Sequence, residues 1–350
     1  MPLSNRWKNT LTLFVKIGIT TALMIWVFRG VDLHEAVNEI REAKIGYLIL
    51  TLFFTWFGHY LCVIRWRFLL EMLSVPMRTG RLVLIYCIGM FSNLILPGLV
   101  GGDLVKIVLT GRDHDHHYSK ALASVYLDRA VGLLALLVIA LSFSMVSPWV
   151  IQGVNLFWAF LLLTLGFIFL NLLLFYPGAH RWVLLLSRKT GRNSIAFKTQ
   201  KLVAAFTGIR HSPVKWGYTF VLSLINQFLV ILSSFVIATA LGIEAPFFDF
   251  AVFIPAISLI TMIPISINGM GLREMATASF FLTIGVSKHQ GIALGFLFSL
   301  LIIASSLPGA VAYLLHKNEV KTEQLEEAQW ELSGEETNDS AEKDCHAGRS

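Results

Sequence analysis

The chain has 350 residues, of which 55% are hydrophobic and only 14% are charged. This composition excludes an ordinary soluble domain, because the apolar residues form blocks close to the ~20 residues that a helix needs to cross a bilayer. The net charge of +6 is unevenly distributed, since acidic side chains are concentrated in residues 317–350. The more basic remainder favours an anionic membrane surface or anionic lipids as partners and argues against nucleic acid.

Hydropathy predicts full membrane spans near residues 11–28, 47–64, 122–146, 151–176, 216–241 and 291–315. The first is expected to be a retained span, because no small-residue cleavage site of a signal peptide follows it. Two further apolar regions, near 82–111 and 250–286, are interrupted by glycine and proline. The sequence therefore predicts an all-α polytopic membrane domain over residues 1–316, followed by an acidic, disordered cytoplasmic tail over residues 317–350.

The orientation follows from the charges of the loops. Residues 177–215 contain eight lysines and arginines and no acidic residue, so this loop is predicted to be cytoplasmic, as is the arginine-rich segment 65–81. The segment after 216–241 has two acidic residues and no basic one before the second broken region. Each broken region must then begin and end on one side of the membrane. This predicts two re-entrant hairpins that enter from opposite faces, with both termini in the cytoplasm.

The tips of the two predicted hairpins have similar sequences. SNLILPGLVGGDLVK (92–106) and IPISINGMGLRE (263–274) each place a proline four residues before a glycine-containing pair, and each continues with an acidic and a basic residue. This similarity favours an inverted repeat whose broken helices meet near the midplane of the bilayer at a substrate site. The alternative is two kinked full spans that pack through small residues.

Ionisable side chains at membrane depth are costly and normally face a cavity or a partner. Asp103 and Lys106 are three residues apart and share one helix face. They either pair with one another or, with the free N–H groups of residues 100–104, form an anion site. Asp128 and Arg129 either pair locally and extend to the interface, or Arg129 projects into the cavity and binds a phosphate with its planar guanidinium.

Two further groups of residues are candidates for the same site. Arg65 and Arg67, at the cytoplasmic end of the second span, are either anchors at the positive membrane face or a vestibule for lipid head groups. In NGMGLRE (268–274) the glycines would let the backbone approach a ligand closely, and Arg273 and Glu274 would begin a second half-helix.

The sequence predicts neither a metal site nor a cofactor. Cys62, Cys87 and Cys345 have no paired spacing, and HDHH (114–117) is interpreted as a solvated polar loop because no ligand recurs at a fixed spacing. The motifs typical of nucleotide-binding proteins, serine hydrolases and zinc proteases do not occur. The candidate acids each have an adjacent base, and no nucleophile and base are evidently paired, so we do not predict an enzyme.

Four motifs together carry a resemblance to a known family. RWRFLL (65–70), FSNLILPGLVGGDLVK (91–106), YLDRAVG (126–132) and IPISINGMGLRE (263–274) resemble the flippase-like membrane family named after the transmembrane domain of lysylphosphatidylglycerol synthase. The resemblance covers most of residues 10–316. It implies paired re-entrant hairpins and movement of phospholipids, aminoacylated phospholipids or polyprenyl-phosphate-linked lipids between leaflets.

The residues that we expect to contact a lipid head group, from the motifs and the charges together, are Arg65, Asn93, Gly101, Gly102, Asp103, Lys106, Asp128, Arg129, Asn268, Gly269, Gly271, Arg273 and Glu274. Two departures from the family pattern bear on this expectation. Lys106 stands where an arginine is expected, which weakens bidentate phosphate binding there. Only the acidic tail follows the membrane domain, so the soluble aminoacyl transfer domain of the synthases is not expected.

The leading hypothesis is a lipid translocase of a bacterial inner membrane, which moves an anionic or polyprenyl-phosphate-linked lipid through a polar cavity between the hairpins. A lipid-modifying enzyme or a glycosyltransferase is its expected partner, and the oligomeric state is not predicted. Two alternatives remain open: a membrane-embedded transferase or hydrolase that uses Asp103, Asp128 or Glu274 as acid or base, and a transporter of small solutes or ions.

Overall fold

The computed structural model describes residues 39–95, 101–114, 117–147, 149–151, 153–175, 212–263 and 266–316, together with the single residues 18 and 21. Four predictions fall wholly or mainly outside these residues: the first span near 11–28, most of the basic loop 177–215, the prolines of the two hairpin tips, and the tail 317–350. The rest of the chain is mostly helical.

Five helices in the described part are long and apolar enough to cross a membrane. They are α3 (Ile45–Met72), α6 (Tyr118–Val146), α7 (Leu156–Phe175), α10 (Pro213–Ala240) and α13 (Lys288–Leu315). Each coincides with a predicted full span, so five of the six predicted spans are confirmed as apolar helices. A helix satisfies its own backbone N–H and C=O groups, which is the condition for crossing hydrocarbon.

The two broken regions form pairs of shorter helices. The first pair is α4 (Thr79–Ile95) and α5 (Gly101–Arg112). The second is α11 (Phe247–Thr261) and α12 (Leu272–Leu282), with a short 3₁₀ turn, η2 (Ile267–Gly269), between them. These helices have 17, 12, 15 and 11 residues, whereas a full span takes about 20.

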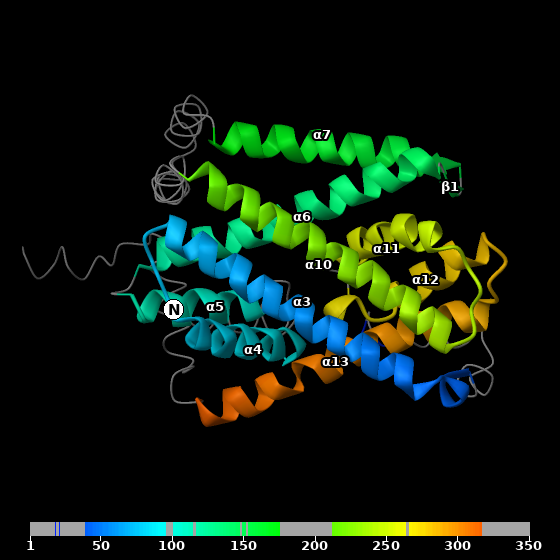
Figure 1. Cartoon of the computed structure of the whole chain (residues 1–350), viewed down its shortest axis with the longest axis horizontal. Coiled ribbons are helices and arrows are strands. Elements are labelled where there is room, and N and C mark those ends of the chain that lie inside the picture. The colour runs from blue at the N-terminus through cyan, green and yellow to red at the C-terminus, as the bar shows by residue number, and fades with distance from the viewer. Residues whose placement is uncertain are drawn as a thin grey trace, which may run out of the picture.

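Each short pair folds back on itself. Arg81, near the start of α4, forms an ion pair with Asp113, just past the end of α5, at 2.7 Å. Near the other end of the pair, the N–H of Gly102 donates to Oδ1 of Asn93 at 2.9 Å. In the second pair the rings of Phe250 and Phe281 lie 4.8 Å apart. Figure 1 shows the two pairs at opposite ends of the molecule, α4 and α5 at one end and α11 and α12 at the other.

The long helices hold the pairs in place through a set of contacts that has two matching halves. Helix α3 packs along α10, α6 contacts both α5 and α11, and α13 contacts both α4 and α12. Helix α7 lies at the periphery beside α6 (Figure 1). Between α6 and α7 the chain forms a small hairpin of β1 (Val150–Ile151) and β2 (Val154–Asn155), a short element that an all-α prediction leaves out.

Glycines allow α13 to approach both pairs closely. A Cβ atom at Gly309 would overlap the carbonyl oxygen of Cys87 in α4, and one at Gly291 would lie 2.7 Å from Cα of Ala278 in α12. A Cβ atom at Gly295 would likewise lie 2.9 Å from Cα of Glu274, which is also in α12. Small residues at helix crossings are the usual means of association in a bilayer, where lipid tails are as apolar as the side chains.

Gly102 makes the corresponding close approach within the first pair. It is helical, and a Cβ atom there would overlap the carbonyl oxygen of Gly89 and lie 2.6 Å from Cγ of Asn93. We expect Gly102→Ala to force α4 and α5 apart and to lower the apparent Tm of the purified protein in detergent. Gly80→Ala in α4 is the matched control, because nothing lies within 4 Å of its Cβ position. An alanine there favours the helix by up to about 1 kcal/mol and should leave the Tm unchanged or slightly raised. Equal Tm values for the two variants would contradict this account.

Candidate functional site

A cavity of about 400 Å³ lies inside the helix bundle. Its size falls within the roughly 300–1,000 Å³ of typical ligand sites. Helices α3, α4, α5, α6, α10, α11 and α13 all contribute to its wall. The polar and ionisable side chains that line it are Thr51, Thr55, His59, Cys62, Arg65, Tyr86, Lys106, Asp128, Arg129, Asn226, Gln227, Ser233 and Ser258.

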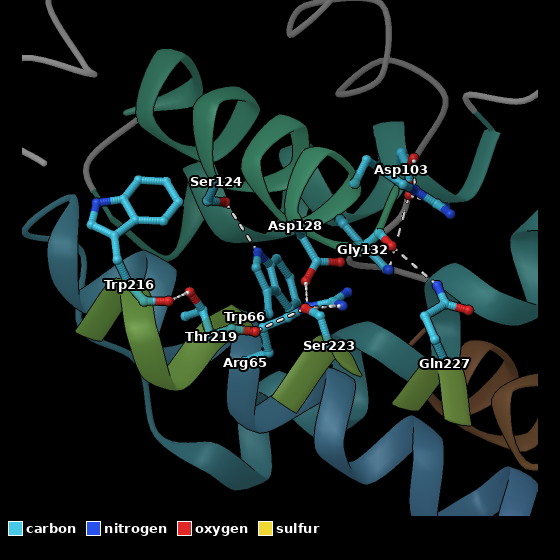
Figure 2. A network of polar contacts seen from close by, with 12 residues as sticks. Arg65, Trp66, Asp103, Ser124, Asp128, Gly132, Trp216, Thr219, Ser223 and Gln227 are labelled. Carbon is cyan, nitrogen blue, oxygen red and sulfur yellow. Dashed lines mark hydrogen bonds and ion pairs between the residues drawn. The ribbon is translucent and has the colours of Figure 1, made fainter. Parts of the chain in front are cut away.

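Arg65 lies in the wall of this cavity, where it joins three helices (Figure 2). Its Nε donates to Oδ1 of Asp128 in α6 at 2.7 Å, and a terminal nitrogen donates to the hydroxyl of Ser223 in α10 at 3.0 Å. Both charged side chains are buried. Gly132 leaves room for the guanidinium of Arg65, because a Cβ atom at this position would lie 3.3 Å from a terminal nitrogen of the arginine. The structure thus places Arg65 beside the cavity as a paired charge.

Arg129, the next residue along α6, forms a second ion pair with a different helix. Its Nε and a terminal nitrogen donate to the two carboxylate oxygens of Asp103 in α5, both at 2.9 Å. The Arg129 side chain is 57% exposed and that of Asp103 only 13%. The bidentate geometry that suits a phosphate is therefore taken up by Asp103. Neither Asp128 nor Arg129 uses its sequence neighbour as its partner.

Lys106 is the third cation of the cavity and the least satisfied. It is buried, with 6% of its surface exposed. Its Nζ lies 3.9 Å from Oδ1 of Asp103, 4.1 Å from the centre of the Tyr86 ring and 5.6 Å from that of Trp66. Within the part of the chain that the structure describes, this ammonium donates no hydrogen bond. The expected proximity of Asp103 and Lys106 is present, but Asp103 binds Arg129 more closely.

Asn93, Gly101 and Gly102 form the joint between α4 and α5. The side chain of Asn93 accepts the N–H of Gly102, one of the donors that the sequence assigns to an anion site. Gly101 begins α5. Asn93 and Gly102 do not line the cavity, so the structure gives them a role in fixing the helix that carries Asp103 and Lys106.

The equivalent joint of the second pair is built on left-handed backbone. Asn268, Gly269 and Gly271 have φ values of 52°, 76° and 79°. Glu274 closes the start of α12: its side chain accepts the N–H of Gly271 at 2.6 Å and the hydroxyl of Ser299 in α13 at 2.7 Å. The carboxylate is fully buried, and it accepts the N–H of the N-cap residue as the Glu of a capping box does. It does not line the 400 Å³ cavity.

Arg273 lines a smaller pocket of about 50 Å³ next to the main cavity, and Ser258 and Phe298 contribute to the walls of both. Its guanidinium donates to the hydroxyl of Ser299 at 2.9 Å and to the carbonyl oxygen of Asn268 at 3.2 Å. It also lies over the ring of Phe298, at 5.4 Å. The structure therefore brings Arg65, Lys106, Asp128 and Arg129 together and leaves the residues of the second tip in a neighbouring site.

Sequence reasoning missed several residues of the cavity wall. His59 contacts the hydroxyl of Ser305 at 3.2 Å, and Gln227 donates to the carbonyl oxygen of Gly132 at 3.1 Å. Asn226 lies against Gly58, whose Cβ position is 2.8 Å from its Oδ1. A periodic signal was available, because small and polar residues recur every three or four positions along α3 and, with a break between Gln227 and Ser233, along α10. In α3 they are Thr51, Thr55, Gly58, Cys62 and Arg65, and in α10 they are Thr219, Ser223, Asn226, Gln227, Ser233 and Ser234.

Comparison with known proteins agrees with the motifs. A family described as the lysylphosphatidylglycerol synthase TM region matches residues 13–309. A UPF0104 membrane protein of Pyrococcus horikoshii is 21% identical over 301 residues, which covers 80% of this chain and 89% of that protein. The family match includes all four motifs, and every helix that lines the cavity falls within or overlaps its range.

The pairing of Arg65 with Asp128 predicts a stability difference. Asp128→Asn keeps the shape of the side chain but leaves the buried guanidinium without a counter-charge, a change that typically costs about 3–5 kcal/mol. Asp113→Asn removes the partner of Arg81 at a more exposed ion pair, where the typical loss is about 0–1 kcal/mol. We expect Asp128→Asn to lower the apparent Tm much more than Asp113→Asn does. Similar losses in the two variants would show that the Arg65 pair is not a structural element.

Proposed function

The chain belongs to the family of the lysylphosphatidylglycerol synthase transmembrane region, and we propose that it moves an anionic or phosphate-linked lipid between the two leaflets of a membrane. The head group enters the polar cavity while the hydrocarbon chains stay in the bilayer. The transported lipid is a phospholipid or a polyprenyl-phosphate-linked lipid, and an enzyme that makes or modifies it is the expected partner.

The observation that carries this proposal is the state of Lys106. An ammonium buried at membrane depth is costly unless its donors are satisfied. In the described part of the chain Lys106 has aromatic rings and one carboxylate at 3.9 Å around it, and it lines a cavity. A phosphate oxygen in that cavity would accept the free N–H groups and neutralise the charge.

The charges around the cavity have the sign that this ligand requires. Among the described residues, Arg65, Lys106 and Arg129 face two carboxylates, Asp103 and Asp128. The formal charges of these five side chains sum to one excess positive charge, which suits a phosphodiester. This count also disfavours a cation transporter, because an entering cation would meet uncompensated positive charge.

Helix α3 has the two faces that a head group in a cavity and chains in lipid would need. Thr51, Thr55 and Arg65 line the cavity, whereas Phe53 and Phe57 on the same helix are largely exposed. The exposed apolar face would contact lipid chains. A lipid could thus keep its chains outside the bundle while its head group lies inside.

The packing supports an inverted repeat. Helices α3, α4, α5 and α6 correspond in order to α10, α11, α12 and α13. Contacts in one set have counterparts in the other: α4 packs on α13 as α11 packs on α6, and α5 packs on α6 as α12 packs on α13. In each pair, the second short helix has an acidic residue near its start. This residue binds the long helix that follows, and the two partners are separated by a similar number of residues. Asp103 binds Arg129, 26 residues on, and Glu274 binds Ser299, 25 residues on.

We assign the two short pairs as re-entrant hairpins that alternately open the cavity to each side. The end of the molecule at which α3 finishes carries Arg67, Arg81 and Lys215, with ion pairs from Arg67 and Lys215 to Glu71. By the positive-inside rule we assign this end to the cytoplasm, and with the predicted first span we propose the same side for both termini. The bacterial inner membrane is the proposed location.

The role of Lys106 is tested with reconstituted vesicles that contain fluorescent phosphatidylglycerol and an impermeant quencher. We expect Lys106→Met, which preserves the length and apolar stem of the side chain, to slow movement of the label between leaflets by about tenfold or more while the apparent Tm is retained. Lys215→Met is the matched control at the membrane edge, and it should transport at the native rate.

The outcomes of this experiment separate the proposed function from its alternatives. Transport by Lys106→Met at the native rate would remove the lysine from the mechanism. Absence of transport by the native protein for every anionic lipid would overturn the translocase proposal. Appearance of a covalently altered lipid in the mass spectrum of the same vesicles would favour a lipid-modifying enzyme.

The re-entrant assignment predicts the sides of two equivalent lysines, one at the start of each long helix that follows a short pair. In a chain without its native cysteines, we expect Lys120→Cys to react with an impermeant maleimide only from the cytoplasm and Lys288→Cys only from the opposite side. Reaction of both positions from one side would contradict the inverted repeat and favour kinked full spans.

A further inference from the structure

The cavity has a charged end and a neutral end. Arg65 and Thr51, which both line it, are 14 residues apart on α3, or roughly 20 Å at 1.5 Å per residue. Helix α10 runs in the opposite direction: Ser223 bonds Arg65, Asn226 lies against Gly58, and Ser233 continues the wall. The charged groups therefore gather at the end nearest α5, and the remainder is lined by apolar side chains with hydroxyl groups, amide groups and His59 among them.

The neutral end contains polar groups that are not used within the protein. Among the described residues, the side-chain amide of Asn226 and the hydroxyl of Ser233 make no hydrogen bond, although both line the cavity. A primary amide offers two donors and an acceptor, and a hydroxyl offers one donor and two acceptor positions. This combination recognises hydroxyl groups.

The carboxylates leave no free place for a positively charged head group. Asp128 is bound to Arg65 at 2.7 Å, and Asp103 is bound at both oxygens to Arg129. Glu274 is fully buried outside the cavity and bonded to Gly271 and Ser299. An ammonium that entered would thus find three cations nearby and no unpaired carboxylate among the described lining residues. Such like-charge contacts are a common means of rejecting the wrong ligand.

We propose that the head group is a phosphodiester that carries an uncharged polyol or sugar, and that the cavity rejects head groups with an ammonium; this inference rests on the proposed function. The phosphate lies at the charged end near Lys106 and Arg65. The hydroxyl groups extend toward Asn226 and Ser233. A glycerophospholipid with a glycerol head and a prenyl-phosphate sugar share this chemistry.

The first test compares three labelled lipids in vesicles that contain the native protein: phosphatidylglycerol, phosphatidylethanolamine and lysyl-phosphatidylglycerol. We expect phosphatidylglycerol to move between leaflets at least about tenfold faster than either lipid with an ammonium, because a like-charge contact in a low-dielectric cavity costs several kcal/mol. Equal rates for phosphatidylglycerol and the lysyl lipid would overturn the inference while leaving the translocase function intact. Absence of movement for all three, and for a labelled prenyl-phosphate hexose in the same vesicles, would instead defeat the function itself.

The second test introduces a free carboxylate at the neutral end. Asn226→Asp is nearly isosteric, and we expect it to slow phosphatidylglycerol and to speed the lysyl lipid, so that the ratio of the two rates falls by about tenfold or more. Asn171→Asp in α7 is the matched control, because Asn171 bonds Tyr126 and the backbone of Phe167 away from the cavity. Its rate ratio should equal that of the native protein. An unchanged ratio in a stably folded Asn226→Asp would show that Asn226 does not face the head group.

A competition experiment separates the two lipid sources. Unlabelled prenyl-phosphate hexose is added to the vesicles that contain labelled phosphatidylglycerol, with prenyl alcohol as the control. Competition by the hexose derivative assigns the site to the shared phosphate and sugar chemistry. Failure of both to compete, with continued transport of phosphatidylglycerol, restricts the assignment to the glycerophospholipid and leaves the proposal in place.

Discussion

The cost of an unpaired charge in hydrocarbon determines the interior of this protein. Removing a charged side chain from water costs several kcal/mol, and the loss is recovered only when a partner of opposite charge and good geometry is present. Here the pairs are made across helices: Arg65 of α3 with Asp128 of α6, and Asp103 of α5 with Arg129 of α6. Helix α6 therefore fixes both the second span and the first short pair. Because these charges are held in the wall, the space between them is a polar cavity.

The second constraint is the space that the charged groups need, and glycine provides it. Gly132 leaves room for the guanidinium of Arg65, and Gly89 leaves room for the stem of Lys106, whose Cε is 2.9 Å from the Cβ position of that glycine. Gly291 and Gly309 leave room for the backbone of neighbouring helices, so that α13 packs tightly on both short pairs. These helical glycines serve close packing, whereas Gly269 and Gly271, at a turn, provide left-handed backbone.

The sequence predicts much of the fold because hydropathy and helix breakers act locally. Five spans and both broken regions follow from runs of apolar residues and from glycine and proline. Partner choice does not follow in this way. Asp128 and Arg129 are neighbours in the chain, but successive helix positions point about 100° apart, so each meets a different helix. Asn226 and His59 were missed for a related reason, since a single amide or imidazole in an apolar run gains meaning only when opposing helices place other polar groups beside it.

Lysine at position 106 suits transport better than the arginine that the family pattern suggests. A guanidinium binds phosphate through two parallel hydrogen bonds in a fixed plane, whereas an ammonium is a point charge on a flexible stem. The ammonium of Lys106 already has a resting place over the Tyr86 ring, 4.1 Å from its centre, which keeps part of its stabilisation when no ligand is present. A carrier must bind its ligand strongly enough to admit it and weakly enough to release it. With Arg65 and Arg129 paired to their own carboxylates, this single loosely held charge would, in the function proposed above, bind a phosphate without trapping it.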